Sequence, residues 1–205
     1  MENVTERPQQ ADAGGRWFVL PDPYWDPGDD EDVPPLEAVV GLWPFEDGKV
    51  GKFRSNPAYR PIDEDSPTDP IDAVLRLVLQ RRAESRHIQL ALRDSLVDLA
   101  MNGDGRPLVT DSPDDVPCVV VATGELHRLR VSSPDWRRVE LEELVRLLAD
   151  GVDVLYNPGG VASVRLTGDF LRDAVSLSDE EVAAFYAEQM AGPGDGQASA
   201  GEPGT

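Results

Sequence analysis

The stretch Val116–Ala122 reads VPCVVVA and decides the fold class. This nearly continuous apolar run with four valines is typical of a central strand that is covered on both faces. Val152–Tyr156 is a second buried strand by the same criterion, and it follows an amphipathic helix that the leucine spacing predicts over 141–148. Buried strands that alternate with such helices indicate an α/β domain.

A β-hairpin is predicted ahead of this strand, because the apolar-rich runs 38–43 and 49–54 flank Asp47-Gly48, a strong turn signal. The other expected elements are a helix over 70–82 capped by Thr68 or Asp69, a shorter helix around 88–92, a hairpin over 96–110, a short helix at 124–129, strands at 136–139 and 161–166, a short helix from 170, and a final helix behind the capping box of Ser178 and Glu181. The prediction is therefore an α/β (α+β) fold, a single mixed-sheet domain with packed helices and hairpins and flexible termini.

Composition divides the chain into three parts. Residues 1–35 are polar, acidic and Pro-rich, and they contain an aromatic segment at 16–25. Residues 36–190 have the length of one ordinary domain and form the expected α/β domain. Residues 191–205 are Gly, Pro, Ser and Ala in the main, and this composition predicts a disordered tail.

The charge of the chain excludes several classes of partner. Its 39 acidic and 19 basic residues give a net charge of −20, which repels nucleic-acid phosphates and anionic lipid headgroups. The first residues carry no basic start followed by an apolar core, and no apolar run approaches the ~20 residues that span a bilayer. We expect a cytoplasmic protein with no membrane insertion and no nucleic-acid partner.

The loop after the second buried strand, Asn157–Gly160, raises the question of an anion site. Its glycines follow a strand, as they do in many phosphate-binding loops. However, no Lys follows them, and the residues beyond read as a strand rather than a helix, so both nucleotide-loop patterns fail. A turn between two strands is the favoured interpretation.

No other motif predicts catalysis, a metal or a cofactor. His87 and His127 lack HExxH or CxxC partners, and Cys118, the only cysteine, reads as a buried thiol rather than a nucleophile paired with His127. The acids of the loop 63–69 lack the pattern of a Ca²⁺ loop, so a solvated loop that caps a helix is favoured over a cation site. The expectation is no catalytic residue, no metal ligand and no cofactor.

The aromatic segment is the main anomaly of the sequence. Trp17, Phe18, Tyr24 and Trp25 lie in an otherwise polar, acidic part of the chain. Such side chains either pack back onto their own domain or serve as anchors for a protein partner, where Trp and Tyr often carry binding energy. These four residues are the candidate partner-binding residues.

The order of several stretches resembles a known family. The stretches are DPYW, AVVGLWPFEDGKVGKFRSNPAYRP, SPTDPIDAVLRLV, NGDGRPLV, VPCVVVATGELHR, WRRVELEELVRLLADGVDVLYNPGG and SVRL, which together cover roughly 17–177. They resemble the actinobacterial type VII secretion system-associated proteins, and the downstream half resembles the SseB-like domain. The resemblance implies an SseB-type α/β domain and an association with an ESX-type secretion apparatus.

The resemblance implies no catalytic residue, but several loop positions match the family's pattern. They are Asn56, Pro57, Tyr59, Arg60, Pro61, Thr68, Asp69, Pro70, Asn157, Pro158 and Gly159, all of which are turn, cap or loop formers. The leading hypothesis is a non-enzymatic accessory protein that binds a component or substrate of the secretion system. The alternatives are an immunity or antitoxin-like acidic binder of a basic partner, and an enzyme whose site joins residues distant in sequence.

Overall fold

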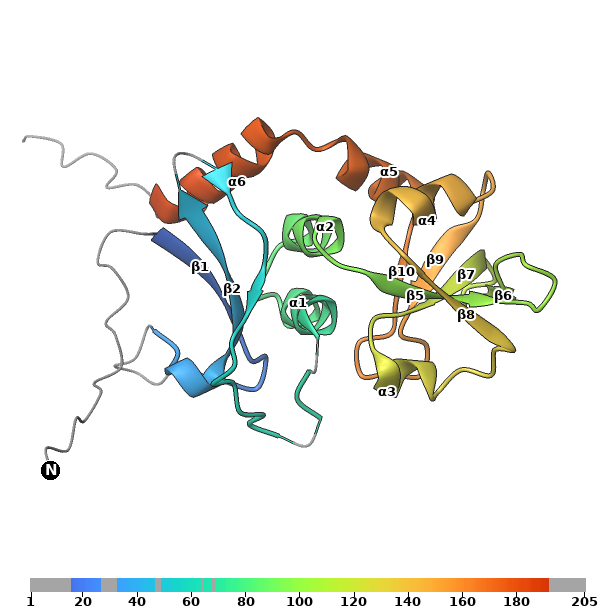
Figure 1. Ribbon diagram of the computed structural model, residues 1–205, viewed down its shortest axis with the longest axis horizontal. Coiled ribbons are helices and arrows are strands. Elements are labelled where there is room, and N and C mark those ends of the chain that lie inside the picture. The colour runs from blue at the N-terminus through green and yellow to red at the C-terminus, as the bar shows by residue number, and fades with distance from the viewer. Residues whose placement is uncertain (1–15, 27–32, 47–48, 64, 68, 192–205) are drawn as a thin grey trace, which may run out of the picture.

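Two β-sheets lie on opposite sides of a pair of helices, α1 (Pro70–Leu79) and α2 (Ser85–Arg93), in the computed structural model (Figure 1). The structure describes residues 16–26, 33–46, 49–63, 65–67 and 69–191. Within these residues the fold is a mixed α+β arrangement, which confirms the predicted class. The predicted turn at Asp47-Gly48, the alternative cap Thr68 and nearly all of the predicted tail lie outside the described residues.

The smaller sheet, sheet A, is antiparallel and includes the aromatic segment. Its strands are β1 (Arg16–Pro21), β2 (Val39–Glu46), β3 (Lys49–Val50) and β4 (Arg54–Ser55). The predicted hairpin is present as β2 and β3, and β4 also pairs with β2. Strand β1 pairs with β2 with Phe18 opposite Trp43, so the aromatic segment packs on its own domain.

The larger sheet, sheet B, is mixed. Its strands are β5 (Val97–Met101), β6 (Val109–Asp111), β7 (Pro117–Ala122), β8 (Asp135–Val139), β9 (Asp153–Tyr156) and β10 (Val164–Leu166). The order is β10-β9-β7-β5-β8, with β7 parallel to β9 and the other pairs antiparallel. The two arms of the hairpin expected over 96–110 pair with each other only through the bridge between Met101 and Pro107. In the second arm, β6 pairs with β7 and not with β5.

The remaining helices begin close to where the sequence predicts. They are α3 (Glu125–Arg128), α4 (Leu141–Leu147), α5 (Gly168–Ser176) and α6 (Asp179–Ala191), with a 3₁₀ turn at Leu36–Ala38. Asp69 is the N-cap of α1, since its carboxylate accepts a hydrogen bond from the Asp72 N–H, and Pro70 occupies the first turn. The capping box of Ser178 and Glu181 begins α6 as predicted.

One hydrophobic core joins the two sheets through α1 and α2. It includes Trp43 from sheet A, Leu75 from α1, and Val121 and Tyr156 from sheet B, all nearly or fully buried. Helix α6 covers sheet A, where the rings of Phe18 and Tyr186 lie 3.8 Å apart (Figure 1). In the described part of the chain, none of the helices has the length and apolar character that a bilayer crossing requires.

Candidate functional site

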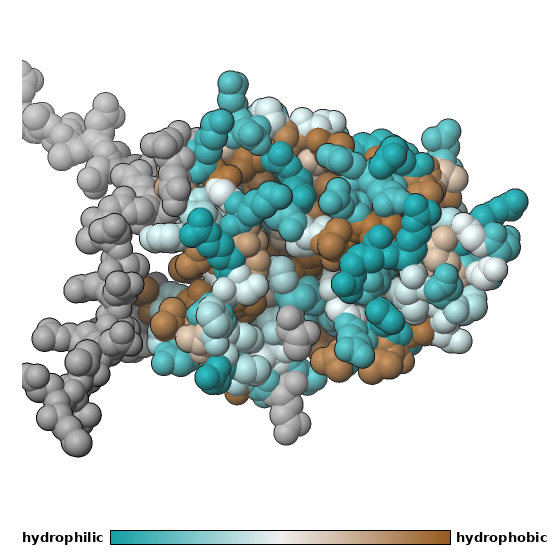
Figure 2. All heavy atoms as spheres, in the orientation of Figure 1, coloured by the Kyte–Doolittle hydropathy of each residue, from teal (hydrophilic) through white to brown (hydrophobic). Residues whose placement is uncertain are grey.

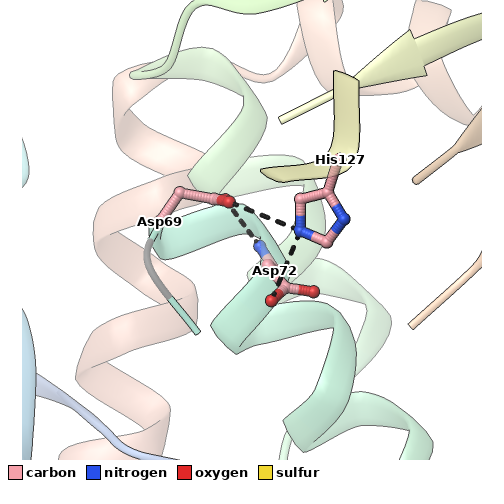
Figure 3. A group of neighbouring side chains, drawn as sticks. All are labelled: Asp69, Asp72 and His127. Atoms are coloured by element: carbon pink, nitrogen blue, oxygen red, sulfur yellow. Dashed lines mark hydrogen bonds and ion pairs between the residues drawn. The ribbon is translucent and has the colours of Figure 1, made fainter. Parts of the chain in front are cut away.

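Two carboxylates and an imidazole meet where α1 faces α3 (Figure 3). His127 Nε2 lies 3.6 Å from Asp72 Oδ2 and 4.0 Å from Asp69 Oδ2. The side chains of His127 and Asp72 are only 4% and 1% exposed, and that of Asp69 is 14% exposed. We call these three residues the Asp-Asp-His cluster.

Local structure explains how each member reaches the cluster. Asp69 caps α1, and Asp72 is one turn further on, so the helix start holds both carboxylates side by side. His127 lies in the short helix α3, which follows directly from the end of the central strand β7. The chain reversal after β7 therefore brings the imidazole back against the start of α1.

Arg76 provides the nearest positive charge. Its guanidinium Nη2 lies 2.5 Å from Asp72 Oδ2 one helical turn away, and both side chains are buried. Burial alone would raise the pKa of Asp72, but the contacts of His127 and Arg76 outweigh it, so this pKa lies below its ordinary value. Burial raises the pKa of Asp69, and the neighbouring charge of Asp72 adds to this effect.

A hydrogen-bonded chain links the cluster to the turn after β9. The Thr123 hydroxyl donates to Asp69 Oδ2 at 2.8 Å, and the Asn157 amide Nδ2 donates to Thr123 Oγ1 at 2.9 Å. The Thr123 N–H in turn donates to Asn157 Oδ1 at 2.9 Å. Asn157 is fully buried, and its amide joins the ends of β7 and β9 through Thr123.

The glycines after Asn157 have structural reasons of their own. Gly159 has φ +74, a conformation that side-chain-bearing residues rarely adopt. At Gly160 a Cβ would lie 3.0 Å from the Asn157 carbonyl oxygen and 3.1 Å from His127 Nδ1. The turn joins the antiparallel strands β9 and β10, as the sequence predicts.

The other family-pattern positions lie in the loop between β4 and α1. Asn56 donates from Nδ2 to the carbonyl oxygens of Leu36 and Val39, which fixes the chain on either side of the 3₁₀ turn. The Tyr59 hydroxyl donates to the buried carboxylate of Asp22 at 2.7 Å. Pro57 and Arg60 are exposed in the same loop. The positions that match the family's pattern therefore lie in two parts of the fold.

The aromatic candidates differ in their exposure. Phe18 faces the core of sheet A, where it contacts Tyr186. Trp17 and Tyr24 are 40% and 38% exposed, and Arg54 lies over the Trp17 ring at 5.9 Å. Trp25 is half-buried, and its N–H donates to the carbonyl oxygen of Asp22.

A groove of about 360 Å³ runs beside β1. Its lining is mostly apolar and consists of Trp17, Phe18, Val19, Leu20, Pro21, Trp43, Val74, Leu77, Arg82, Ala83, His87 and Tyr186. Strand β1 is at the edge of sheet A, so half of its backbone N–H and C=O groups point away from β2 on this side. Figure 2 shows apolar side chains at the surface on the sheet A side, among hydrophilic ones.

The sequence did not predict the Asp-Asp-His cluster. It grouped Asp69 with the acids of the preceding loop, whereas the structure pairs it with Asp72 and His127. The available signal was the spacing of Asp69 and Asp72 at a helix start, but nothing local indicates that His127 lies against them. Chemically, two carboxylates and an imidazole can share a proton or hold a cation.

Comparison with protein-family models, with curated proteins and with solved structures gave no match.

Proposed function

We propose that this protein is a non-enzymatic accessory protein that acts by binding an extended segment of a partner protein along strand β1. The observation that carries the proposal is the apolar groove beside the outer edge of β1, which pairs with no second strand among the described residues. Val19 is 46% exposed there and Trp17 is 40% exposed, although both are large apolar side chains. Trp is enriched among the residues that carry the binding energy of protein interfaces, so Trp17 is the expected anchor.

The edge of β1 and the groove suit different parts of a peptide. An added strand would form main-chain hydrogen bonds with the outward N–H and C=O groups of β1. Alternate side chains of that strand would then point into the groove, whose floor includes Leu20 and Leu77. Main-chain pairing supplies affinity and the groove supplies selectivity for apolar side chains.

The rim of the groove carries one positive charge in an otherwise acidic protein. It belongs to Arg82, whose guanidinium donates to the Pro23 carbonyl oxygen just beyond β1, whereas burial lowers the pKa of His87 and favours its neutral form. An apolar segment with acidic flanks suits this rim better than a basic segment does. The sequence resemblance supports a secretion-system component or substrate as the source of the segment, and we expect the encounter in the cytoplasm.

Affinity capture from an actinobacterium that carries a type VII secretion system tests the proposal. Deletion of residues 1–35 is not a suitable variant, because it removes β1 itself. Val19→Asp places a charge in the groove, and Val109→Asp is its matched control because Val109 is 52% exposed on β6 of sheet B. We expect the wild type and Val109→Asp to retain one protein that Val19→Asp loses.

Two outcomes would contradict the proposal. Retention of the same protein by Val19→Asp would show that the interface lies away from β1. Recovery of only basic proteins, released by moderate salt from all three forms alike, would favour the acidic immunity-like binder, whose attraction rests on the net charge of −20.

A further inference from the structure

We propose that Asp69, Asp72 and His127 form a binding site for a divalent transition-metal cation, with Zn²⁺ as the expected occupant. The inference does not depend on the proposed function, because none of the three residues lines the groove beside β1. It rests on the placement of donor atoms, on a buried carboxylate oxygen that lacks a partner, and on the groups that hold the carboxylates.

The donor atoms lie slightly further apart than the ligands of one cation. One donor atom from each residue lies within 4.8 Å of the other two, and the two distances from His127 Nε2 are 3.6 Å and 4.0 Å. Around tetrahedral zinc, with bonds of about 2.0–2.2 Å, neighbouring donor atoms lie roughly 3.4 Å apart. Small rotations of three side chains would therefore bring all three donors into contact with one ion (Figure 3).

One buried oxygen of the cluster accepts no hydrogen bond from the described residues. Asp72 is 1% exposed, and its Oδ1 atom has no hydrogen-bond partner among the described residues. Arg76 and His127 both approach the other oxygen, Oδ2. A buried carboxylate oxygen without a donor is costly, and a cation that both oxygens of Asp72 contact would satisfy it.

Both carboxylates have outer contacts of the kind found around metal ligands, whereas His127 Nδ1 has no hydrogen-bond partner among the described residues. Arg76 holds Asp72 from one side, and the Thr123 hydroxyl donates to Asp69 Oδ2. Hydrogen bonds of this kind fix the orientation of carboxylate ligands. The charge of Arg76 also offsets part of the repulsion between the two carboxylates, so the cluster can persist before a cation binds.

The donor types select the class of cation. Imidazole nitrogen favours Zn²⁺ and its transition-metal neighbours over Mg²⁺ and Ca²⁺, which prefer oxygen ligands alone. Three protein ligands leave a fourth position open. Because Asp69 is the most exposed member, it marks the side from which a cation enters.

Isothermal titration of the full-length, chelator-treated protein tests this site. We expect one Zn²⁺ per chain, with Mg²⁺ bound far more weakly, and a loss of affinity of about tenfold or more in His127→Gln. His87→Gln is the matched control, because His87 is the other of the two histidines and lies near Phe185 rather than in the cluster. We expect Zn²⁺ affinity in this control to equal that of the wild type.

Equal Zn²⁺ affinity in His127→Gln and the wild type would overturn the proposal, as would the absence of Zn²⁺ binding or a Mg²⁺ affinity equal to that of Zn²⁺. X-ray absorption at the zinc edge of the wild-type protein keeps the test decisive if the variant fails to fold. Scattering from one imidazole and oxygen ligands is the expected result. A shell of oxygen alone, or one that contains sulfur from Cys118, would overturn the assignment.

Discussion

The hydroxyl of Tyr59 donates to the carboxylate of Asp22 at 2.7 Å, across 37 positions of the chain. The Ser66 hydroxyl donates to the same oxygen at 2.7 Å, and the carboxylate is fully buried. This contact closes the loop that precedes α1 over the end of β1. It explains why the aromatic segment is part of the fold even though its composition resembles that of a disordered arm.

Asp22→Ala should therefore lower the free energy of unfolding by about 3 kcal/mol, because it leaves several buried donors without an acceptor. Asp26→Ala is the control, since Asp26 is exposed a few positions away. Urea denaturation followed by tryptophan fluorescence measures both. A change below about 0.5 kcal/mol in Asp22→Ala, the range of ordinary surface substitutions, would show that the carboxylate does not hold β1 in place.

Asp72→Asn should lower the free energy of unfolding by about 3–5 kcal/mol, since it leaves the buried Arg76 guanidinium without its charged partner. Asp169→Asn is the control, because Asp169 pairs with Arg172 at the surface and is 91% exposed. The control should change stability by less than about 1 kcal/mol. Similar losses in the two variants would contradict a special role for the buried pair.

The Asp72 carboxylate also determines part of the dependence of the unfolding free energy on acidic pH. Because the pKa of Asp72 is lowered below 3.8 in the folded protein, its contribution is present above pH 3.8 and is lost as the pH falls through the folded pKa. The unfolding free energies of the wild type and Asp72→Asn should therefore converge as the pH falls below the folded pKa of Asp72. A constant difference between them down to strongly acidic pH would contradict the lowered pKa.

Tyr156→Phe should raise the free energy of unfolding by about 1 kcal/mol at neutral pH. The Tyr156 hydroxyl is buried in the core and has no hydrogen-bond partner among the described residues, so its removal relieves an uncompensated desolvation cost. Tyr186→Phe is a useful comparison at another buried tyrosine. A destabilised Tyr156→Phe variant would mean that the hydroxyl has a partner after all.

Alkaline pH extends this test. Burial raises the pKa of Tyr156 above its ordinary value of 10.0, so the neutral hydroxyl is favoured in the folded protein. The stability that is linked to this proton is present below pH 10.0 and is lost as the pH rises through the folded pKa. The wild type should lose stability above this pH more steeply than Tyr156→Phe, and equal slopes would contradict the assignment.

Local patterns predicted most of the elements. Asp69 and Pro70 begin α1 because a side-chain acceptor and a missing N–H both suit a helix start, and these are properties of neighbouring residues. The valines of β7 are likewise sufficient to predict a buried strand, since a strand covered on both faces needs apolar residues throughout. The turn at Asn157 follows from its own residue types.

Contacts between distant segments could not be predicted in the same way. Strand β1 exists because β2 pairs with it and because Tyr59 reaches Asp22, and neither fact is visible in the acidic, Pro-rich composition around it. His127 meets Asp69 only after the sheet has placed the end of β7 beside the start of α1. A single sequence records neither distance, so the groove and the Asp-Asp-His cluster both required the structure.

Amide hydrogen exchange of the full-length protein, with and without the captured partner, tests the central claim most directly. If a segment of the partner adds to the edge of β1, the outward amides of Trp17–Leu20 should exchange more slowly in the complex, because they become hydrogen-bonded. Amides of β6, an edge strand of sheet B, should not change. Unchanged exchange in β1 together with protection elsewhere on the surface would contradict the account.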